Sequence, residues 1–378
     1  MTTARPLKLM IPGPVDVDDD VLDALARPLI PHYGPLWMPI YHETVERLQQ
    51  LFGTRNTLFM IPGPGTAALD AALGSMMRTG DKILVAANGF FGRRIMALGR
   101  AYGLEVCVEE SALDRPLDPE AIRRRLLAER GVRALALVHL ETSTGVLNPL
   151  REIAAVAREL DVPVIVDAVS SMGGVPLPVD EWGIDVCVTV INKCLACPPA
   201  IAPISISRRA WDQIETTGDS HHGWYLDLRV WRDYATRWGS WHPTPTTLPT
   251  NNIVAALASL RQIAAMGLEA HYRQFVDAAQ LVRSGLKQLG FELFTDEAYT
   301  SPLVTAVRER PDLDIEEMRR YLLDERGIMI SGGLDDLRGH IFRIGHIGRA
   351  RSPEYSRPLL QGVKAYMRLV GLKPDGGV

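Results

Sequence analysis

The fold is decided by the stretch Val162-Pro163-Val164-Ile165-Val166-Asp167 and by a second apolar run, Ile184 to Val190, which leads into Ile191-Asn192-Lys193-Cys194. Apolar runs without polar alternation are typical of strands that are buried on both faces of a sheet. Each run ends close to a charged residue, and Asp167 precedes Lys193 by 26 positions. We therefore expect both charged side chains at the carboxyl ends of neighbouring buried strands.

Helical and strand-like patterns alternate on either side of these runs. Asp118-Pro119 pairs a capping side chain with a proline at the first helical position, so a helix is expected to begin there. Other helices are predicted at 41–52 (ending at Gly53), 66–77 and 150–160, with strands at 83–87 and 134–138. This alternation predicts an α/β fold in which helices cover both faces of a parallel sheet.

The last third of the chain has a different pattern. From Trp224 to Pro249 the sequence is rich in tryptophan, proline and threonine with little periodicity, which predicts a long irregular segment. Helices at 251–266 and 271–289 are expected next, followed by strands at 303–307, 328–331 and 341–344 with helices at 314–326 and at the end. These elements predict a smaller α+β domain, with the large domain at 15–255 and the small one at 256–378 together with 1–14.

Composition limits the classes of function. A net charge of −4 and a pI near 6.2 argue against nucleic acid or an anionic membrane as a partner. Met1 to Arg5 lacks the apolar core of a signal peptide, and no stretch approaches the length of a membrane helix. We therefore expect a cytoplasmic protein.

The four cysteines are Cys107, Cys187, Cys194 and Cys197. The first two lie in strand-like runs and are expected in the core. Cys194 and Cys197 have the spacing of a zinc or redox pair, but zinc requires a second ligand pair and none is visible. No metal is therefore predicted; a tight loop is the plain interpretation, and a redox role stays open.

Parallel sheets bind ligands at the carboxyl ends of their strands, and several candidate groups fall there. Lys193 and Asp167 match the two groups that pyridoxal phosphate requires: a lysine that holds the cofactor as a Schiff base, and a carboxylate that keeps its ring nitrogen protonated. The turn Ile61-Pro62-Gly63-Pro64-Gly65-Thr66 opens a helix, where Gly65, Thr66 and Ala67 could donate N–H groups to a phosphate. An aromatic residue in Gly89-Phe90-Phe91-Gly92 could stack on a flat ring.

Each candidate also has a purely structural interpretation. Thr142 and Ser143 could bond a cofactor ring or simply cap a turn. Arg343 could bind a carboxylate through its planar fork or form a structural ion pair. A lysine just past a strand end can be solvent-exposed, and a phenylalanine can be ordinary core. The agreement of several groups at one sheet edge favours the functional interpretation.

Taken together, the segments resemble the class V, fold type I pyridoxal-phosphate-dependent aminotransferases, in particular the alanine–glyoxylate, serine–glyoxylate and serine–pyruvate branch. The resemblance runs from Ile11-Pro12-Gly13-Pro14 to the Arg343 strand, nearly the whole chain. Its most specific motifs are Glu141-Thr142-Ser143-Thr144-Gly145-Val146, Val166-Asp167-Ala168-Val169-Ser170-Ser171, Asn192-Lys193 with Pro198-Pro199, Gly332-Gly333-Leu334 and Phe342-Arg343-Ile344-Gly345-His346-Ile347-Gly348.

The resemblance implies a large domain with a mostly parallel seven-stranded sheet, a homodimer with shared active sites, and a role for each matching residue. Lys193 and Asp167 would be catalytic, Val169 would pack beneath the cofactor ring, and Phe91 would stack above it. Thr142 would contact the ring; Gly65, Thr66 and Asn192 would hold the phosphate, with Thr247 reaching the phosphate of the neighbouring subunit. Arg343 would bind the substrate carboxylate, and Gly13 and Tyr33 would edge the substrate pocket.

The implied reaction moves an amino group from alanine or serine to glyoxylate or pyruvate by a ping-pong route. Three departures loosen the substrate assignment: Pro64 replaces a side-chain donor, Ala200 replaces a glycine, and Thr244 stands where some relatives have tyrosine.

Several alternatives stay open. The Asn192-Lys193-Cys194 signature is shared with 2-aminoethylphosphonate–pyruvate and pyridoxamine–pyruvate aminotransferases, although the latter would need an acidic group near Pro64. Ureidoglycine–glyoxylate aminotransfer lies within the leading branch. A cysteine desulfurase would place histidines at Asn192 and Phe91, and a non-catalytic protein of this fold is the remote alternative.

Overall fold

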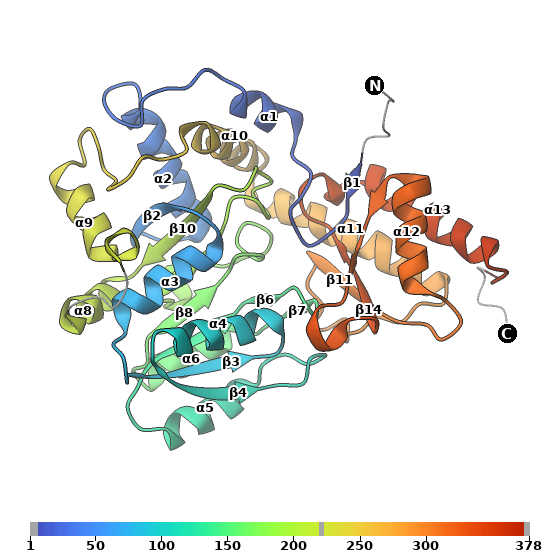
Figure 1. Ribbon diagram of the computed structural model, residues 1–378, viewed down its shortest axis with the longest axis horizontal. Helices are drawn as coiled ribbons and strands as arrows, with labels where there is room; N and C mark the ends of the chain where they lie inside the picture. The colour runs from blue at the N-terminus through green and yellow to red at the C-terminus, as the bar shows by residue number, and fades with distance from the viewer. Residues whose placement is uncertain (1–6, 219–222, 374–378) are drawn as a thin grey trace.

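The computed structural model describes residues 7–218 and 223–373, and Figure 1 shows two bodies of unequal size. The larger hydrophobic core contains buried residues from Val21 to Leu260. A second core gathers residues between Val282 and Met367 and also includes Met10. The predicted domain boundary between residues 255 and 256 stays a prediction. Residues 1–6, which include Met1 to Arg5, and residues 374–378 belong to the predicted small domain and lie outside the described residues.

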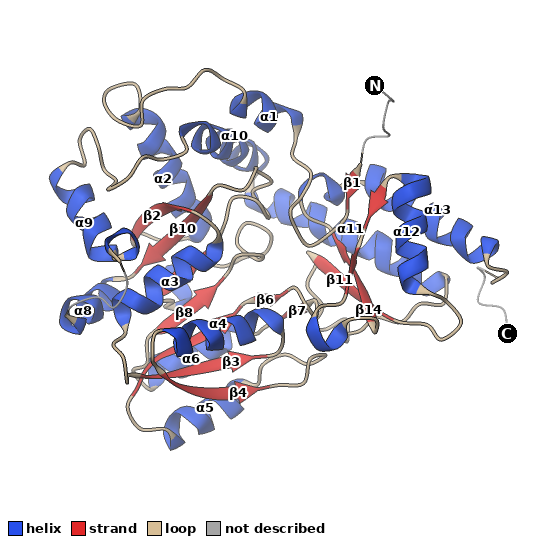
Figure 2. Cartoon of the chain, in the orientation of Figure 1, coloured by secondary structure: helices blue, strands red, loops and turns tan. Residues whose placement is uncertain are grey.

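The larger body is built on a seven-stranded, mostly parallel sheet, as the sequence predicted (Figure 2). Its order is β2-β10-β9-β8-β5-β3-β4, and β10 alone runs antiparallel to both of its neighbours. Its strands are β2 (Thr57–Pro62), β3 (Lys82–Ala87), β4 (Glu105–Glu110), β5 (Val132–Val138), β8 (Val164–Asp167), β9 (Val186–Val188) and β10 (Ile201–Ile206). The predictions missed β2, β4 and β10. Central strands carry almost only apolar side chains because both faces are covered.

Helices follow the strands and pack on the sheet. Helix α3 (Gly65–Met76) contacts β8, β9 and β10, whereas α4 (Phe90–Ala101) contacts β3, β4 and β5. In α5 (Pro119–Ala128) the Asp118 side chain accepts from the Glu120 N–H, as the sequence predicted. The remaining helices of this body are α1 (Asp19–Leu25), α2 (Met38–Phe52), α6 (Leu150–Glu159), α7 (Val179–Trp182), α8 (Arg208–Thr217), α10 (Thr250–Met266) and the short η1 (Trp224–Leu226).

The segment 224–249 is not irregular throughout, so that expectation was wrong for its first half. Helix α9 spans Leu228–Arg237, and the Asp227 carboxylate caps it by accepting from the Arg229 N–H. Leu228 and Trp231 are both fully buried. The helix was missed because only these two of its ten residues are buried, while four of the others are arginine or aspartate.

The smaller body is an antiparallel sheet with helices packed against it. The sheet order is β11 (Val304–Arg308), β14 (Ile341–Gly345) and β13 (Ser331–Gly332), and β12 (Ile328–Met329) pairs instead with the N-terminal β1 (Lys8–Leu9). The predicted single strand at 328–331 is therefore two short strands. The helices are α11 (Leu268–Gln288), α12 (Ile315–Arg326) and α13 (Pro353–Leu369), with the short helices η2 (Asp335–Leu337) and η3 (Gly348–Arg351). Separately from both larger sheets, β6 (Leu140–Glu141) and β7 (Val146–Leu147) pair as a two-stranded antiparallel hairpin.

Within the described residues, no single helix has the length and apolarity needed to cross a membrane. Helices α10 and α11 meet that test only when taken as a pair, and they are bent by 94° at their junction.

Candidate active site

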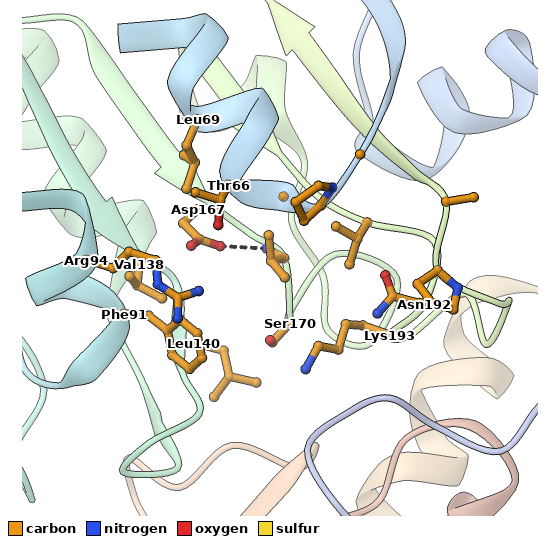
Figure 3. A pocket seen from close by; sticks show the side chains of 17 residues that line it. Thr66, Leu69, Phe91, Arg94, Val138, Leu140, Asp167, Ser170, Asn192 and Lys193 are labelled. Carbon is orange, nitrogen blue, oxygen red and sulfur yellow. Dashed lines mark hydrogen bonds between the residues drawn. The ribbon is translucent and has the colours of Figure 1, made fainter. Parts of the chain in front are cut away.

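One cavity of about 490 Å³ lies at the carboxyl edge of the large sheet, between the starts of α3 and α4 (Figure 3). Seven of the residues proposed from the sequence line it, drawn from four separate segments. They are Gly65, Thr66, Phe91, Asp167, Val169, Asn192 and Lys193. The prediction that residues at the carboxyl ends of the strands meet in one place is therefore confirmed for these seven.

Asp167 is the last residue of β8 and points into this cavity (Figure 3). Its Oδ1 accepts from the Val169 N–H at 2.9 Å. Burial raises the pKa of Asp167 to about 6; that N–H and the nearby Arg94 and Lys193 charges lower the pKa, while the Glu141 charge raises it. A buried carboxylate such as that of Asp167 is suited to accept a hydrogen bond from a positively charged N–H group of a bound molecule.

Lys193 lies in the loop after β9, and its amino group projects into the same cavity. The pKa of Lys193 is lowered to about 8, mainly by burial; the Arg343 charge also lowers it, whereas Cys194 and the Asp167 charge raise it. The Nζ donates to the Pro12 carbonyl oxygen at 2.5 Å. A Cβ at position 13 would lie 2.3 Å from that Nζ, so the N-terminal segment can pack against the lysine in this way only with glycine at position 13. A buried lysine with a lowered pKa is a suitable nucleophile and base.

The turn between β2 and α3 provides the third feature of the site. The first amides of α3 have no acceptor within the helix and, with the helix dipole, favour an anion. The approach is tight, because a Cβ at Gly65 would lie 2.4 Å from Cγ2 of Val169. Together, an amide-lined helix start, a buried carboxylate and a partly buried lysine fit pyridoxal phosphate.

Phe91 is the second residue of α4 and forms one wall of the cavity. The Arg94 guanidinium lies 4.8 Å from the Phe91 ring centroid and 5.1 Å from that of Phe90, and it also lines the cavity. Sequence reasoning missed Arg94, although its position three residues after Phe91 places both on one helix face.

Five of the proposed residues do not line this cavity: Gly13, Tyr33, Thr142, Thr247 and Arg343. Thr142 is buried and presents its carbonyl oxygen to Arg343 Nη1 at 2.9 Å, while Arg343 Nε donates to Gly332 at 2.9 Å. Burial lowers the pKa of Arg343 to about 10. Tyr33 is half exposed with its ring 5.7 Å from that of Trp241, and Thr247 is exposed.

The four cysteines are all buried and unpaired by disulfides. Burial raises the pKa of both Cys194 and Cys197 to about 12. Raised thiol pKa values disfavour the reactive thiolate, so the structure lends no support to a redox pair.

A partly buried lysine and a buried carboxylate at the edge of a mostly parallel sheet are the pair that a pyridoxal-phosphate enzyme requires. The family model described as aminotransferase class-V matches residues 28–339, and the chain belongs to this family. It is thus a transaminase of the predicted class.

Individual relatives agree. An uncharacterized aminotransferase of Methanocaldococcus jannaschii is 37% identical over 90% of this chain and 87% of that protein. An alanine–glyoxylate aminotransferase of Drosophila melanogaster is 30% identical over 92% of this chain and 88% of that protein. The crystal structure of ureidoglycine–glyoxylate aminotransferase from Bacillus subtilis covers 100% of this chain and 97% of its own, with a TM-score of 0.93 and 32% identity.

Proposed function

We propose that this protein is a pyridoxal-phosphate-dependent transaminase that moves an amino group from a small amino acid, alanine or serine, to glyoxylate or pyruvate by a ping-pong route. The observation that carries the proposal is the pairing of Lys193 and Asp167 in one cavity beside the start of α3. A cytoplasmic location remains part of the proposal. When bound, the cofactor supplies an electron sink for the charge left when an amino acid loses its Cα proton.

The residues of this chain have separate tasks in the proposal. Lys193 Nζ holds the cofactor covalently at rest and later removes and returns the Cα proton, for which a pKa near 8 is well matched to neutral pH. The Asp167 carboxylate holds a proton on the ring nitrogen. Phe91 and Val169 enclose the ring, and Gly65, Thr66 and Asn192 hold the phosphate, with Thr142 against the ring.

Arg343 would bind the substrate carboxylate, with Gly13 and Tyr33 at the pocket edge. Arg343 belongs to the smaller body, and its positive charge is one of the groups that lower the pKa of Lys193. Two of its nitrogens are fixed by the carbonyls of Thr142 and Gly332. A fixed guanidinium gives both half-reactions one common anchor, which supports a ping-pong route.

A homodimer with shared sites is part of the proposal. Tyr33, Trp224, Trp238 and Trp241 are each between 44% and 54% exposed. Exposed aromatic side chains of this kind are typical of interfaces. Thr247 is exposed in the same part of the chain, which suits contact with a neighbouring phosphate. Sedimentation equilibrium would test the dimer, and a protein that stays monomeric would contradict it.

The experiment for the reaction follows the absorbance of purified protein, loaded with pyridoxal phosphate, during addition of L-alanine, L-serine and 2-aminoethylphosphonate in turn. Loss of the cofactor band with alanine or serine, and its return with glyoxylate or pyruvate, is the expected result. Loss only with the phosphonate would assign the protein to the 2-aminoethylphosphonate–pyruvate class instead. Failure to gain a cofactor band would overturn the proposal.

Matched variants sharpen this experiment. Lys193→Ala should abolish turnover, whereas Lys287→Ala removes a lysine that pairs with Glu297 on the surface and should change nothing. Pyridoxamine–pyruvate transfer is the second candidate, because such a transaminase of Mesorhizobium japonicum is 27% identical over 98% of this chain. Its test is pyridoxamine as amino donor; the expected result is no turnover, since Pro64 brings no acidic group.

A further inference from the structure

The carboxylate of Glu141 is fully buried behind the cavity wall, although it does not line the cavity. Its Oε2 accepts from the backbone N–H groups of Phe91 at 2.9 Å and Gly92 at 3.1 Å. Its Oε1 accepts from the Ser143 N–H at 3.0 Å and from the Ser143 hydroxyl at 2.5 Å. Four donors therefore converge on one side chain.

Ser143 extends the same arrangement, because its Oγ accepts from the Phe90 N–H at 3.0 Å. Glu141 and Ser143 together satisfy the amides of the first three residues of α4. Helices normally leave their first amides to capping side chains, and here the cap comes from a loop 50 residues away. Gly89 makes room for it, since a Cβ there would lie 2.5 Å from the Glu141 side chain.

The buried carboxylate is costly to maintain. Burial raises the pKa of Glu141, and its four donors oppose that shift. An uncompensated buried charge would be strongly unfavourable, so the four donors and the carboxylate depend on one another. A glutamate kept under such conditions fixes the backbone from which the Phe91 ring projects.

The backbone of the turn 141–143 also contacts Arg343, the residue proposed to bind the substrate carboxylate. The Thr142 carbonyl accepts from Arg343 Nη1, one residue after Glu141. The turn 141–143 thus contacts both the Phe91 wall, in the larger body, and the guanidinium proposed to bind substrate, in the smaller one. No other described side chain bonds the Phe91 and Gly92 amides.

We propose that Glu141 is a positioning residue of the active site, which fixes Phe91 against the cofactor ring and supports the turn that orients Arg343. The inference rests on the proposed function, because it assigns Phe91 and Arg343 to the cofactor and the substrate.

The test compares Glu141→Gln with a matched control, Asp185→Asn. A glutamine keeps one acceptor oxygen but replaces the other with an NH2 donor, so the backbone N–H groups that faced the replaced oxygen lose their acceptor. Asp185 is also a buried carboxylate that accepts from a backbone N–H and a serine hydroxyl, Val164 N at 2.9 Å and Ser207 Oγ at 2.8 Å. It lies at the amino ends of β8 and β9, at the opposite edge of the sheet from the cavity.

Four readouts separate positioning from general destabilisation: the dissociation constant for pyridoxal phosphate, the circular dichroism of the bound cofactor, amide hydrogen exchange over 88–95 without cofactor, and the KM for the amino donor. For Glu141→Gln we expect cofactor affinity to fall about 10- to 100-fold, altered cofactor dichroism, faster exchange over 88–95, and a raised KM for the amino donor. Asp185→Asn should lower stability but leave all four quantities unchanged.

Ser143→Ala provides a second variant if Glu141→Gln does not fold. It removes two of the bonds and keeps those from Phe91 and Gly92 to Glu141, so the same changes should occur at smaller size. Wild-type behaviour in either variant, or equal changes in Asp185→Asn, would overturn the inference alone. A wild-type protein that fails to bind pyridoxal phosphate would instead refute the proposed function, and this inference with it.

Discussion

Replacing Asp167 by asparagine should make the cofactor-free protein more stable and the enzyme inactive. The substitution keeps the shape of the side chain and the Oδ1 that accepts from Val169, but removes a buried negative charge. Burial holds the pKa of Asp167 at about 6, above the value near 4 of an exposed aspartate. Since the raised pKa belongs to the folded state, the folded protein binds more protons than the unfolded chain between these two values.

The magnitude follows from linkage between protonation and folding. Where the folded state binds more protons, stability falls as pH rises, so the contribution of Asp167 is least unfavourable below pH 4 and fully unfavourable above pH 6. The cost is about 0.5 kcal/mol at pH 4, about 1.5 kcal/mol at pH 5 and about 3 kcal/mol at pH 8. Asp167→Asn should remove it, so the difference between variant and wild type should follow the same curve.

The assay is urea unfolding of the cofactor-free proteins at pH 5 and pH 8, at one protein concentration because association would also shift stability. Asp212→Asn, on the exposed surface of α8, is the control and should have no effect at either pH. Turnover of Asp167→Asn with cofactor should fall at least about 100-fold. A variant no more stable than wild type at pH 8, or a difference that does not shrink at pH 5, would refute this reasoning.

Three further predictions concern packing and substrate binding. Gly65→Ala would place a Cβ 2.4 Å from Val169, so it should destabilise the protein by about 1–3 kcal/mol and weaken pyridoxal phosphate binding in a titration, whereas Gly223→Ala, with open space around it, should do neither. Arg343→Lys should raise KM for the amino donor about 10-fold with a smaller effect on kcat, measured by steady-state kinetics, because lysine cannot replace the planar fork. Trp231→Ala should cost about 3–5 kcal/mol in urea unfolding, because this indole is fully buried.

The sequence was most informative where hydrophobic pattern and strand ends coincide. The apolar run before Asp167 predicted both a buried strand and the position of its carboxylate, because parallel strands end at the same sheet edge. The antiparallel β10 was missed because Pro203 and Ser205 interrupt its apolar run, and a proline argues against a central strand. Strand β4 was missed because its exposed edge position breaks the apolar run with glutamates.

Residues that influence the site through contacts between segments distant in the sequence could not be predicted. Glu141 was quoted only as part of a motif, and nothing local shows that its side chain turns away from the cavity to cap a helix 50 residues earlier in the chain. Arg94 was passed over as one of many arginines on helix surfaces. The contact of Gly13 with Lys193 depends on how the N-terminal segment folds back over the site, which periodicity does not specify.

Glu141 and Arg94 matter because their charges shift the pKa of Asp167 in opposite directions. The Glu141 charge raises the pKa of Asp167, and the Arg94 charge lowers it, so the shift that remains comes mainly from burial. A cation that binds against the carboxylate favours its charged form and so offsets the cost of burial. A protonated ring nitrogen is such a cation. The stability that Asp167 removes from the cofactor-free protein is therefore available to cofactor binding, and we expect pyridoxal phosphate to stabilise wild type more than Asp167→Asn.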